Sequence, residues 1–406
     1  MSGCPMRPFL DFERFRDGTP RAQLNALREQ HRILKEEDDF QPGYHWLVFR
    51  RDDIDHVLQN PQLFSNNYGV FIEDMPDRVL AEKQQSMTFM DPPQHRRHRV
   101  LVEGAFRPQA LKAREPAMRA AAKAILAPVL AQGQCEFVTE VAAKLPMAVM
   151  FSLMGVKPED EAYVVDTTNA VTMADDPDFA KNRRAGYDAS VALVEFGEAL
   201  AADHRRNPRD TLTQEVLRSD LNGERLSDRE FGRFFSNLIV GGLETTRNTL
   251  SLAMWEFIHH PDQYRALQND LSLVAGAVEE SLRHRNTVVY LRRTAVAETE
   301  LAGETIRPGD KVVCVLGGPN RDPALFERPD EFDITRPPEH SRRNIRTFGG
   351  GPHFCLGMHQ ARLNLTVMME EIARTIDQPR LNGAAKQARS LFMDGLKALP
   401  IAFDRR

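Results

Sequence analysis

The segment Phe348-Gly349-Gly350-Gly351-Pro352-His353-Phe354-Cys355-Leu356-Gly357 is the most informative stretch of this 406-residue chain. Its glycines allow left-handed backbone turns, so backbone N–H groups can point at the Cys355 sulfur without a Cβ clash. An amphipathic helix is predicted to follow, and a helix N-terminus stabilises a thiolate. Taken alone, the segment also fits a buried cysteine beside a flexible loop. The full spacing F-G-x-G-x-H-x-C-x-G should arise by chance in roughly one in a million chains of this length, given 23 Phe, 24 Gly, 12 His and 4 Cys.

The composition is that of an ordinary globular protein, with 42% hydrophobic and 27% charged residues. The net charge of −5 argues against a dedicated nucleic-acid binder. The four cysteines, Cys4, Cys135, Cys314 and Cys355, are too far apart in sequence for a paired metal or redox motif. No signal peptide is recognisable, and no apolar stretch reaches the roughly 18 residues of a membrane span. We therefore expect a cytoplasmic protein without a membrane anchor.

Helical periodicity dominates the chain, and short strand patterns are fewer. The predicted helices are 21–35, 109–131, 228–260, 261–283 and 356–376, and the predicted strands are 46–49, 288–291 and 311–316. Ser227 is the expected N-cap of the third helix, and residues 307–310 form a turn between strands. Segment 60–87 has weak periodicity, segment 173–184 carries two Asp-Pro-like breaks, and both are interpreted as lid or substrate-contact loops. No linker or repeat marks a boundary, so we expect one domain over residues 1–406, mainly α with small β-sheets (α+β).

The segment Gly241-Gly242-Leu243-Glu244-Thr245-Thr246 lies in the middle of the predicted helix 228–260. Two adjacent glycines in a helix cost about 1 to 2 kcal/mol relative to alanine, so the site needs a reason. One reason is a ligand close to the backbone, and the alternative is a helix crossing that needs small residues. A threonine there can hydrogen-bond to the helix backbone, and a neighbouring carboxylate can supply protons.

The cysteine segment resembles the haem-binding loop of the cytochromes P-450, the haem-thiolate monooxygenases, and every defining position of that loop is filled. The resemblance covers roughly residues 90–400. It implies the cytochrome P-450 fold, with haem b between the long central helix and the helix after the cysteine loop. It also implies that Cys355 is the axial ligand of the haem iron, whose electron donation favours O–O cleavage.

The resemblance extends to further site residues. The implied haem-binding residues are His95, Arg99, Gly241, Arg293, Phe348, Gly349, His353, Cys355 and Gly357. His95, Arg99, Arg293 and His353 match positions that contact the haem propionates, although each read separately is compatible with a surface charge. Arg292 competes with Arg293 for this role.

Two more groups of residues match the family. Glu244 and Thr245 match its acid–alcohol pair, which is inferred to deliver protons to iron-bound dioxygen. Glu280 and Arg283 lie one helical turn apart, and with Arg336 they match a structural lock beneath the haem. The same acid–base spacing recurs on other predicted helices of this chain, so the evidence for the lock is its order relative to the other motifs.

A basic cluster precedes the cysteine loop at residues 341–346, and Arg96, Arg97 and Arg362 are expected on the same face. It is either a solvated surface or a patch that steers an acidic electron donor to the thiolate side of the haem. Because no flavin or iron–sulfur domain is fused to the chain, electrons must come from another protein. The resemblance implies a ferredoxin-type donor with its reductase, which draws on NAD(P)H.

The sequence therefore predicts a soluble, monomeric, bacterial-type monooxygenase that uses O2 and two electrons to hydroxylate a medium-sized apolar molecule. Terpenoid, steroid-like, aliphatic and aromatic compounds all fit. The predicted pocket residues are Val70, Phe71, Leu243, Val288, Val289 and Phe392, the last with Met393. The alternatives are a peroxide-dependent peroxygenase, whose known members lack the acid–alcohol pair, and a non-catalytic haem sensor or carrier.

Overall fold

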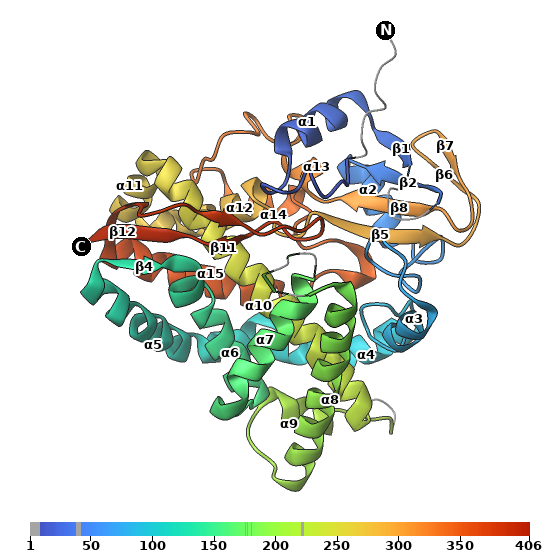
Figure 1. Cartoon of the computed structure of the whole chain (residues 1–406), viewed down its shortest axis with the longest axis horizontal. Coiled ribbons are helices and arrows are strands. Elements are labelled where there is room, and N and C mark those ends of the chain that lie inside the picture. Colours follow the sequence, from blue (N-terminus) through green and yellow to red (C-terminus); the bar gives the residue numbers. More distant parts are fainter. Residues whose placement is uncertain (1–8, 38–41, 175, 177, 180, 221–222) are drawn as a thin grey trace.

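The computed structural model describes residues 9–37, 42–174, 176, 178–179, 181–220 and 223–406. Helices make up most of this structure, and a small mixed sheet lies at one side of it (Figure 1). The α-helices are α1 (Arg21–Gln30), α2 (Arg51–Gln59), α3 (Asp77–Lys83), α4 (Gln94–Val102), α5 (Pro108–Gln132), α6 (Lys144–Met154), α7 (Glu161–Thr172), α8 (Arg183–Arg206), α9 (Leu212–Arg218), α10 (Asp228–His259), α11 (Pro261–Asn269), α12 (Val274–His284), α13 (Gly317–Asn320), α14 (Pro338–Asn344) and α15 (Met358–Thr375). The strands are β1 (Ile33–Glu37), β2 (Tyr44–Val48), β3 (Phe64–Ser65), β4 (Gln134–Glu136), β5 (Tyr290–Ala295), β6 (Thr299–Leu301), β7 (Glu304–Ile306), β8 (Lys311–Val315), β9 (Ile376–Leu381), β10 (Lys386–Gln387), β11 (Leu396–Ala398) and β12 (Pro400–Arg405).

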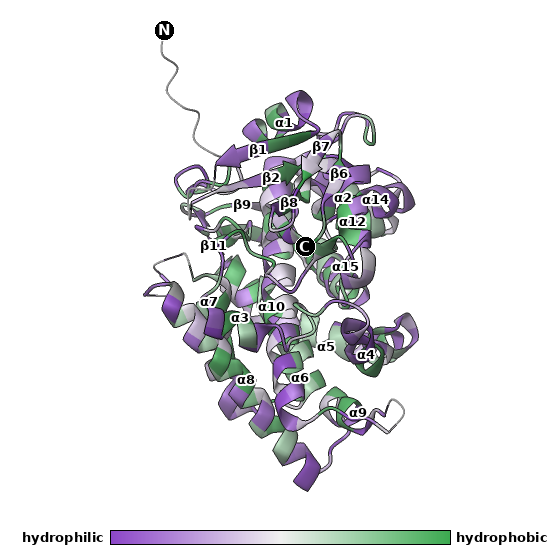
Figure 2. Ribbon diagram, turned by 90° about the vertical axis from the view of Figure 1, so that its right-hand side faces the viewer, coloured by the Kyte–Doolittle hydropathy of each residue, from purple (hydrophilic) through white to green (hydrophobic). Residues whose placement is uncertain are grey.

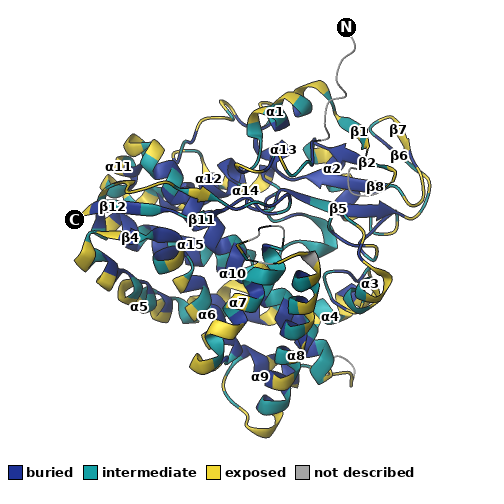
Figure 3. Cartoon of the chain, viewed as in Figure 1, coloured by how far each residue is buried: buried dark blue, intermediate teal, exposed yellow. Residues whose placement is uncertain are grey.

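The largest sheet has the strand order β1-β2-β8-β5-β3. Only β2 and β8 pair in parallel, with His45 opposite Lys311, and the other neighbours are antiparallel. Strand β8 is buried along its whole length, as Figure 3 shows for this side of the molecule. A continuous apolar run such as that of residues 312–316 is typical of a strand covered on both faces. The sheet therefore fixes β5 by pairing it with the buried strand β8.

Helix α10 is the long central helix of the molecule and spans about 48 Å at 1.5 Å per residue. It begins in a capping box, in which Ser227 and Glu230 satisfy each other's backbone N–H groups. It crosses α8 closely, because a Cβ at Gly232 would lie 2.3 Å from the carbonyl oxygen of Val194. On its other side, α10 shares a hydrophobic core with α5, α12 and α15, and Figure 2 shows green, hydrophobic segments alternating with purple, hydrophilic ones along the helices.

The predicted elements are mostly confirmed, with three corrections. The predicted helix 21–35 ends at Gln30, because residues 33–37 pair with β2 as strand β1. The predicted helix 261–283 is divided into α11 and α12 by a turn in which Asp270 Oδ1 accepts from the Ser272 N–H at 2.9 Å. Strand β5 begins at Tyr290 rather than Val288, which forms only an isolated bridge with Met393.

The structure also bears on the cysteines and on membrane insertion. Cys135 and Cys314 are buried free thiols, and Cys4 lies outside the described residues. Among the described residues, no helix is long and apolar enough to cross a membrane. Of the expected loop 173–184, positions 175, 177 and 180 lie outside the described residues.

Candidate functional site

A cavity of about 510 Å³ lies between α10 and the loop that carries Cys355. It is lined by residues that lie far apart in sequence, from the segment before α3, from α4, from β5 and from the segment before β11. Its lining includes all nine residues expected to bind haem, namely His95, Arg99, Gly241, Arg293, Phe348, Gly349, His353, Cys355 and Gly357. The fold thus brings the sequence motifs together around one space.

The Cys355 loop is held in a tight conformation. The Cys355 N–H donates to the Phe348 carbonyl at 3.1 Å, and the Gly357 N–H donates to the Cys355 sulfur. Gly349 and Gly351 have φ of 70° and 62°, which favours glycine. A Cβ at Gly351 would also lie 2.0 Å from the Leu58 carbonyl oxygen of α2. Burial raises the pKa of the Cys355 thiol, whereas the Gly357 hydrogen bond and the charges of two arginines oppose that rise.

Two histidines and an arginine lie beside the loop. The rings of His95 on α4 and His353 are 4.0 Å apart between centroids. Burial lowers the pKa of His95 to about 4 and lowers that of His353 further, with nearby cations contributing to both shifts. The guanidinium of Arg99 donates to the Pro352 carbonyl at 3.2 Å. At neutral pH the two histidines are therefore uncharged, and the positive charge at this rim comes from Arg99, which also lies 3.9 Å from the Glu103 carboxylate.

The structure distinguishes the two adjacent arginines of β5. Arg293 is buried and lines the cavity, and the only hydrogen bond of its side chain among the described residues goes to the Arg292 carbonyl at 2.8 Å. Burial lowers the pKa of Arg293 to about 10. Arg292 instead forms an ion pair with Asp74 on the other side of the strand. Arg293 is thus the residue that faces the cavity.

These residues fit a haem with its two propionates. The Nε2 atom of His353 is buried and has no hydrogen-bond partner among the described residues. Such a buried polar atom costs free energy unless a ligand satisfies it. A Cβ at Gly241 or Gly357 would meet no described atom within 4 Å, so both backbones border open space on opposite sides of the cavity. A thiol, four cationic or ionisable groups and two open glycine backbones match an iron porphyrin with two carboxylates.

Helix α10 presents Thr245 to the cavity. The Thr245 hydroxyl donates to the Gly241 carbonyl at 2.6 Å, and the Thr249 hydroxyl donates to the Thr245 carbonyl at 2.8 Å. Such back-bonding locally loosens the helix ladder. Because the close crossing with α8 is made at Gly232 and not at Gly241, the ligand explanation of Gly241 is favoured over a helix crossing.

Glu244 does not line the cavity with Thr245. It is buried and ion-paired with Arg247 one turn further along α10, and Arg247 Nη1 reaches Asn169 on α7 at 3.3 Å. Burial raises the pKa of the Glu244 carboxyl, and the Arg247 charge opposes that rise. The expected acid–alcohol pair is therefore adjacent in sequence but faces two different surroundings.

The three residues of the expected lock are in contact. Arg283 donates to both Glu280 carboxylate oxygens at 2.7 Å, and Arg336 Nε reaches Oε1 of the same carboxylate at 3.4 Å. Both Glu280 and Arg283 are fully buried. Arg283 Nη1 also donates to the carbonyls of Asn320 and Pro329, so this cluster joins α12 to the chain leading into the cysteine loop.

The basic cluster is partly neutralised. Arg342 and Arg362 both pair with the buried Glu279, at 2.8 and 2.6 Å. Arg346 pairs with Asp55, and Arg97 pairs with Glu224. Of the predicted cluster, Arg96 and Arg343 are exposed and have no ion pair among the described residues. The positive face is smaller than the sequence indicates.

Five of the seven predicted pocket residues line the cavity and two do not. Val70, Phe71, Val288, Phe392 and Met393 line the cavity. Leu243 and Val289 do not, because each side chain packs into a hydrophobic cluster, with residues such as Met150 and Val315 respectively. Residues that the sequence analysis missed include Lys83, Tyr187, Ser190, Asn237 and Thr246. The expected contact segment 60–87 contributes several residues to the lining, among them Lys83, and the other expected segment, 173–184, contributes Ala174.

Comparison with known proteins agrees with this geometry. The cytochrome P-450 family model matches residues 40–376. A methyl-branched lipid omega-hydroxylase of Mycobacterium tuberculosis is 33% identical over 371 residues, covering 89% of this chain and 86% of that protein. A steroid C26-monooxygenase of the same species is 34% identical over 349 residues, covering 85% of this chain and 91% of the relative.

Solved structures give the same result. A cytochrome P-450 of Mycobacterium marinum in complex with pseudoionone superposes with a TM-score of 0.89 and 29% identity, covering 98% of this chain and all of that one. A structure from Novosphingobium aromaticivorans superposes with a TM-score of 0.86 and 27% identity, covering 99% of this chain and all of that one. The expected fold, mainly helical with small sheets, is confirmed.

Proposed function

This chain belongs to the cytochrome P-450 family and is a monooxygenase of that family, and from this premise we propose that it hydroxylates a medium-sized apolar molecule of lipid or steroid type. Its cofactor is haem b, its co-substrate is O2, and two electrons arrive from NAD(P)H through a separate ferredoxin and reductase. The observation that carries the proposal is the cavity that Cys355 lines together with apolar side chains such as Phe71, Val288 and Phe392.

The names of two relatives support the substrate class. One acts on methyl-branched lipids at the omega position, and another is a steroid C26-monooxygenase, so both names denote apolar substrates. An apolar lining excludes water and holds such a molecule by burial of its surface. Hydroxylation places the oxygen in the bond nearest the reacting centre, so the shape of the lining selects the position.

The roles of the chain's residues follow from their places. Bound haem supplies the activation of dioxygen and the insertion of one oxygen atom into a C–H bond. Cys355 holds the iron, and the Gly357 N–H stabilises the charge on its sulfur. His95, Arg99, Arg293 and His353 hold the propionates. Thr245 donates a hydrogen bond at the cavity wall.

Glu244 acts one step behind Thr245. Burial raises the pKa of the Glu244 carboxyl, so this group can take up a proton when it gives up its ion pair with Arg247. Delivery to the cavity then requires Glu244 to leave Arg247 and rotate towards Thr245. Glu280, Arg283 and Arg336 position the loop and take no part in proton transfer.

The thiolate has a direct test. The reduced wild-type protein with carbon monoxide should show the red-shifted Soret band of thiolate ligation, and Cys355→Ser should lose it completely. Cys135→Ser, which replaces a buried cysteine outside the cavity, is the control and should keep the band. A wild-type spectrum without that band contradicts the proposal.

The rival functions separate at Thr245. In a monooxygenase, Thr245→Ala should divert reducing equivalents from product to hydrogen peroxide, measured as peroxide formed per NAD(P)H consumed. A haem sensor or carrier should show no such change. Turnover with hydrogen peroxide but none with ferredoxin, reductase and NAD(P)H would identify a peroxygenase instead.

A further inference from the structure

A second pocket of about 450 Å³ adjoins the central cavity between α3, α8 and α10. Five residues line both spaces, namely Lys83, Tyr187, Ser190, Ser236 and Asn237. The two spaces therefore share a wall made of polar side chains. We call these five residues the junction.

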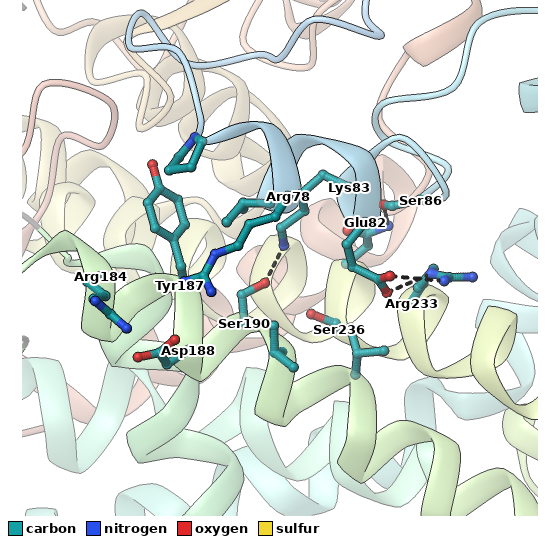
Figure 4. A pocket seen from close by; sticks show the side chains of 15 residues that line it. Arg78, Glu82, Lys83, Ser86, Arg184, Tyr187, Asp188, Ser190, Arg233 and Ser236 are labelled. Atoms are coloured by element: carbon teal, nitrogen blue, oxygen red, sulfur yellow. Dashed lines mark hydrogen bonds and ion pairs between the residues drawn. The ribbon is translucent and has the colours of Figure 1, made fainter.

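Lys83 is the cation of the junction. It is the last residue of α3, and its ammonium group donates to the hydroxyl of Ser190 on α8, as Figure 4 shows. Among the described residues it has no carboxylate partner. Ser190 is itself buried, so the ammonium lies against a neutral hydroxyl and not in bulk water. A partly desolvated ammonium without a counter-ion favours the binding of an anion.

The neighbouring charges do not satisfy Lys83. Glu82, the adjacent acid, is bound by Arg229 at 3.1 Å and by Arg233 at 3.0 Å. The other charged residues lining the second pocket are Arg78 on α3, and Arg184 and Asp188 on α8, and none of these three forms an ion pair among the described residues. With Lys83 and Arg233 the second pocket has four cationic groups against two acidic ones, so its net charge favours an anionic ligand.

Within the central cavity, Lys83 lies away from the other cationic or ionisable groups. His95, Arg99, Arg293 and His353 surround the Cys355 loop, and Lys83 lies at the junction. On α10, Thr245 lies nine residues after Ser236, which corresponds to about 13 Å along the helix axis. An apolar lining, including Val70 and Phe71, lies in the same cavity. The Lys83 ammonium group and the Cys355 loop therefore lie near different parts of α10. An elongated ligand could place one end at Lys83 and the other at the reaction site.

We propose that Lys83, with Ser190, binds the carboxylate of an amphipathic substrate whose apolar chain extends through the central cavity towards Cys355. This rests on the proposed monooxygenase function and narrows its substrate class to molecules with an acid group at one end. Lys83 is then a specificity-determining residue, and oxidation falls on the chain end remote from the carboxylate.

Decanoate and decan-1-ol are suitable probes, because they share a chain and differ in charge. Isothermal titration calorimetry of the haem-loaded protein measures binding without turnover. We expect wild type to bind decanoate at least about tenfold more tightly than decan-1-ol, the range of a charge-assisted hydrogen bond. Lys83→Met should remove that preference and leave decan-1-ol binding unchanged, and Lys83→Arg should restore part of it. Lys123→Met, on the exposed side of α5, is the matched control and should behave as wild type.

Three outcomes overturn the assignment: wild type fails to bind decanoate, wild type binds both probes equally, or Lys83→Met weakens both probes alike. The wild-type comparison stands even where Lys83→Met does not fold. Because calorimetry reports binding alone, a protein that prefers decanoate but lacks the thiolate Soret band contradicts the monooxygenase function and not the role of Lys83.

Discussion

The two ends of the central cavity are built in different ways. At the Cys355 end, the loop is pressed against α2 at Gly351, and the Glu280–Arg283 pair beneath it is fully buried. At the Lys83 end, exposed Arg78 and Arg184 line a second pocket and form no ion pair among the described residues. The first end fixes atoms in place, and the second leaves charge available to a ligand. The difference suggests that the reaction is determined at one end and the choice of substrate at the other.

The largest effect is expected at the buried lock. Arg283→Met leaves the Glu280 carboxylate buried with the Asp333 N–H and the weaker contact from Arg336, and loss of one partner of such a pair costs about 3 to 5 kcal/mol. Urea unfolding measures this loss. Arg265→Met removes an arginine with the same spacing from an acid, Asp262, on the exposed surface of α11, and should cost less than about 1 kcal/mol. Equal losses in the two variants would show that the buried pair at the Cys355 end is no firmer than an exposed ion pair.

A smaller loss is expected at the cysteine loop. Gly351→Ala puts a Cβ at a φ of 62° and against the Leu58 carbonyl, which should cost at least about 2 kcal/mol and weaken haem retention. Gly104→Ala is the control, because it has neither a positive φ nor a described atom within 4 Å of the new Cβ. Its free energy of unfolding should change by less than about 0.5 kcal/mol. A stable Gly351→Ala protein that retains haem would show that the loop is adaptable.

The smallest effect is expected at the junction and concerns binding alone. Burial lowers the pKa of Lys83 to about 8, while the Glu82 charge opposes the shift. Below pH 8 Lys83 is charged. Above pH 8 it is mostly neutral and must take up a proton before it can bind a carboxylate, which weakens binding. Decanoate itself stays ionised, because ordinary carboxyl pKa values lie near 4. The dissociation constant of decanoate should therefore rise about tenfold between pH 7 and pH 9, whereas that of decan-1-ol should stay constant. A parallel rise for both probes would exclude Lys83 as the titrating group.

The same contrast governs what the sequence could predict. The Cys355 end was foreseen in detail because its residues form compact motifs, in which glycine spacing and a single cysteine have few alternative explanations. The Lys83 end was not foreseen, since α3, α8 and α10 contribute one or two residues each and their convergence is decided by packing. Leu243 lies outside the cavity lining for a related reason: it belongs to the glycine–threonine motif, but the helix turns its side chain into the core beside Met150.

Long-range ion pairs could not be predicted from the sequence. Residues such as Arg342 and Arg362 lie in a basic cluster in sequence, and nothing local indicates that both contact Glu279 on α12. Conversely, Glu280, Arg283 and Arg336 were assembled correctly from motif order, because the family resemblance supplied the long-range contact. Arg292 and Arg293 could be separated only once the face of β5 was known.

Glu279 has a consequence for how the protein responds to ionic strength. Its carboxylate is almost fully buried, and Arg362, which binds it at 2.6 Å, is mostly buried as well, so dissolved ions reach that contact poorly, whereas Arg342 is exposed. Added salt therefore screens Arg96 and Arg343 far more than it screens Arg362. The positive electrostatic potential on the thiolate side thus has two contributions. The contribution of the mostly buried Arg362 stays nearly constant with ionic strength, whereas that of exposed Arg96 and Arg343 falls as salt is added.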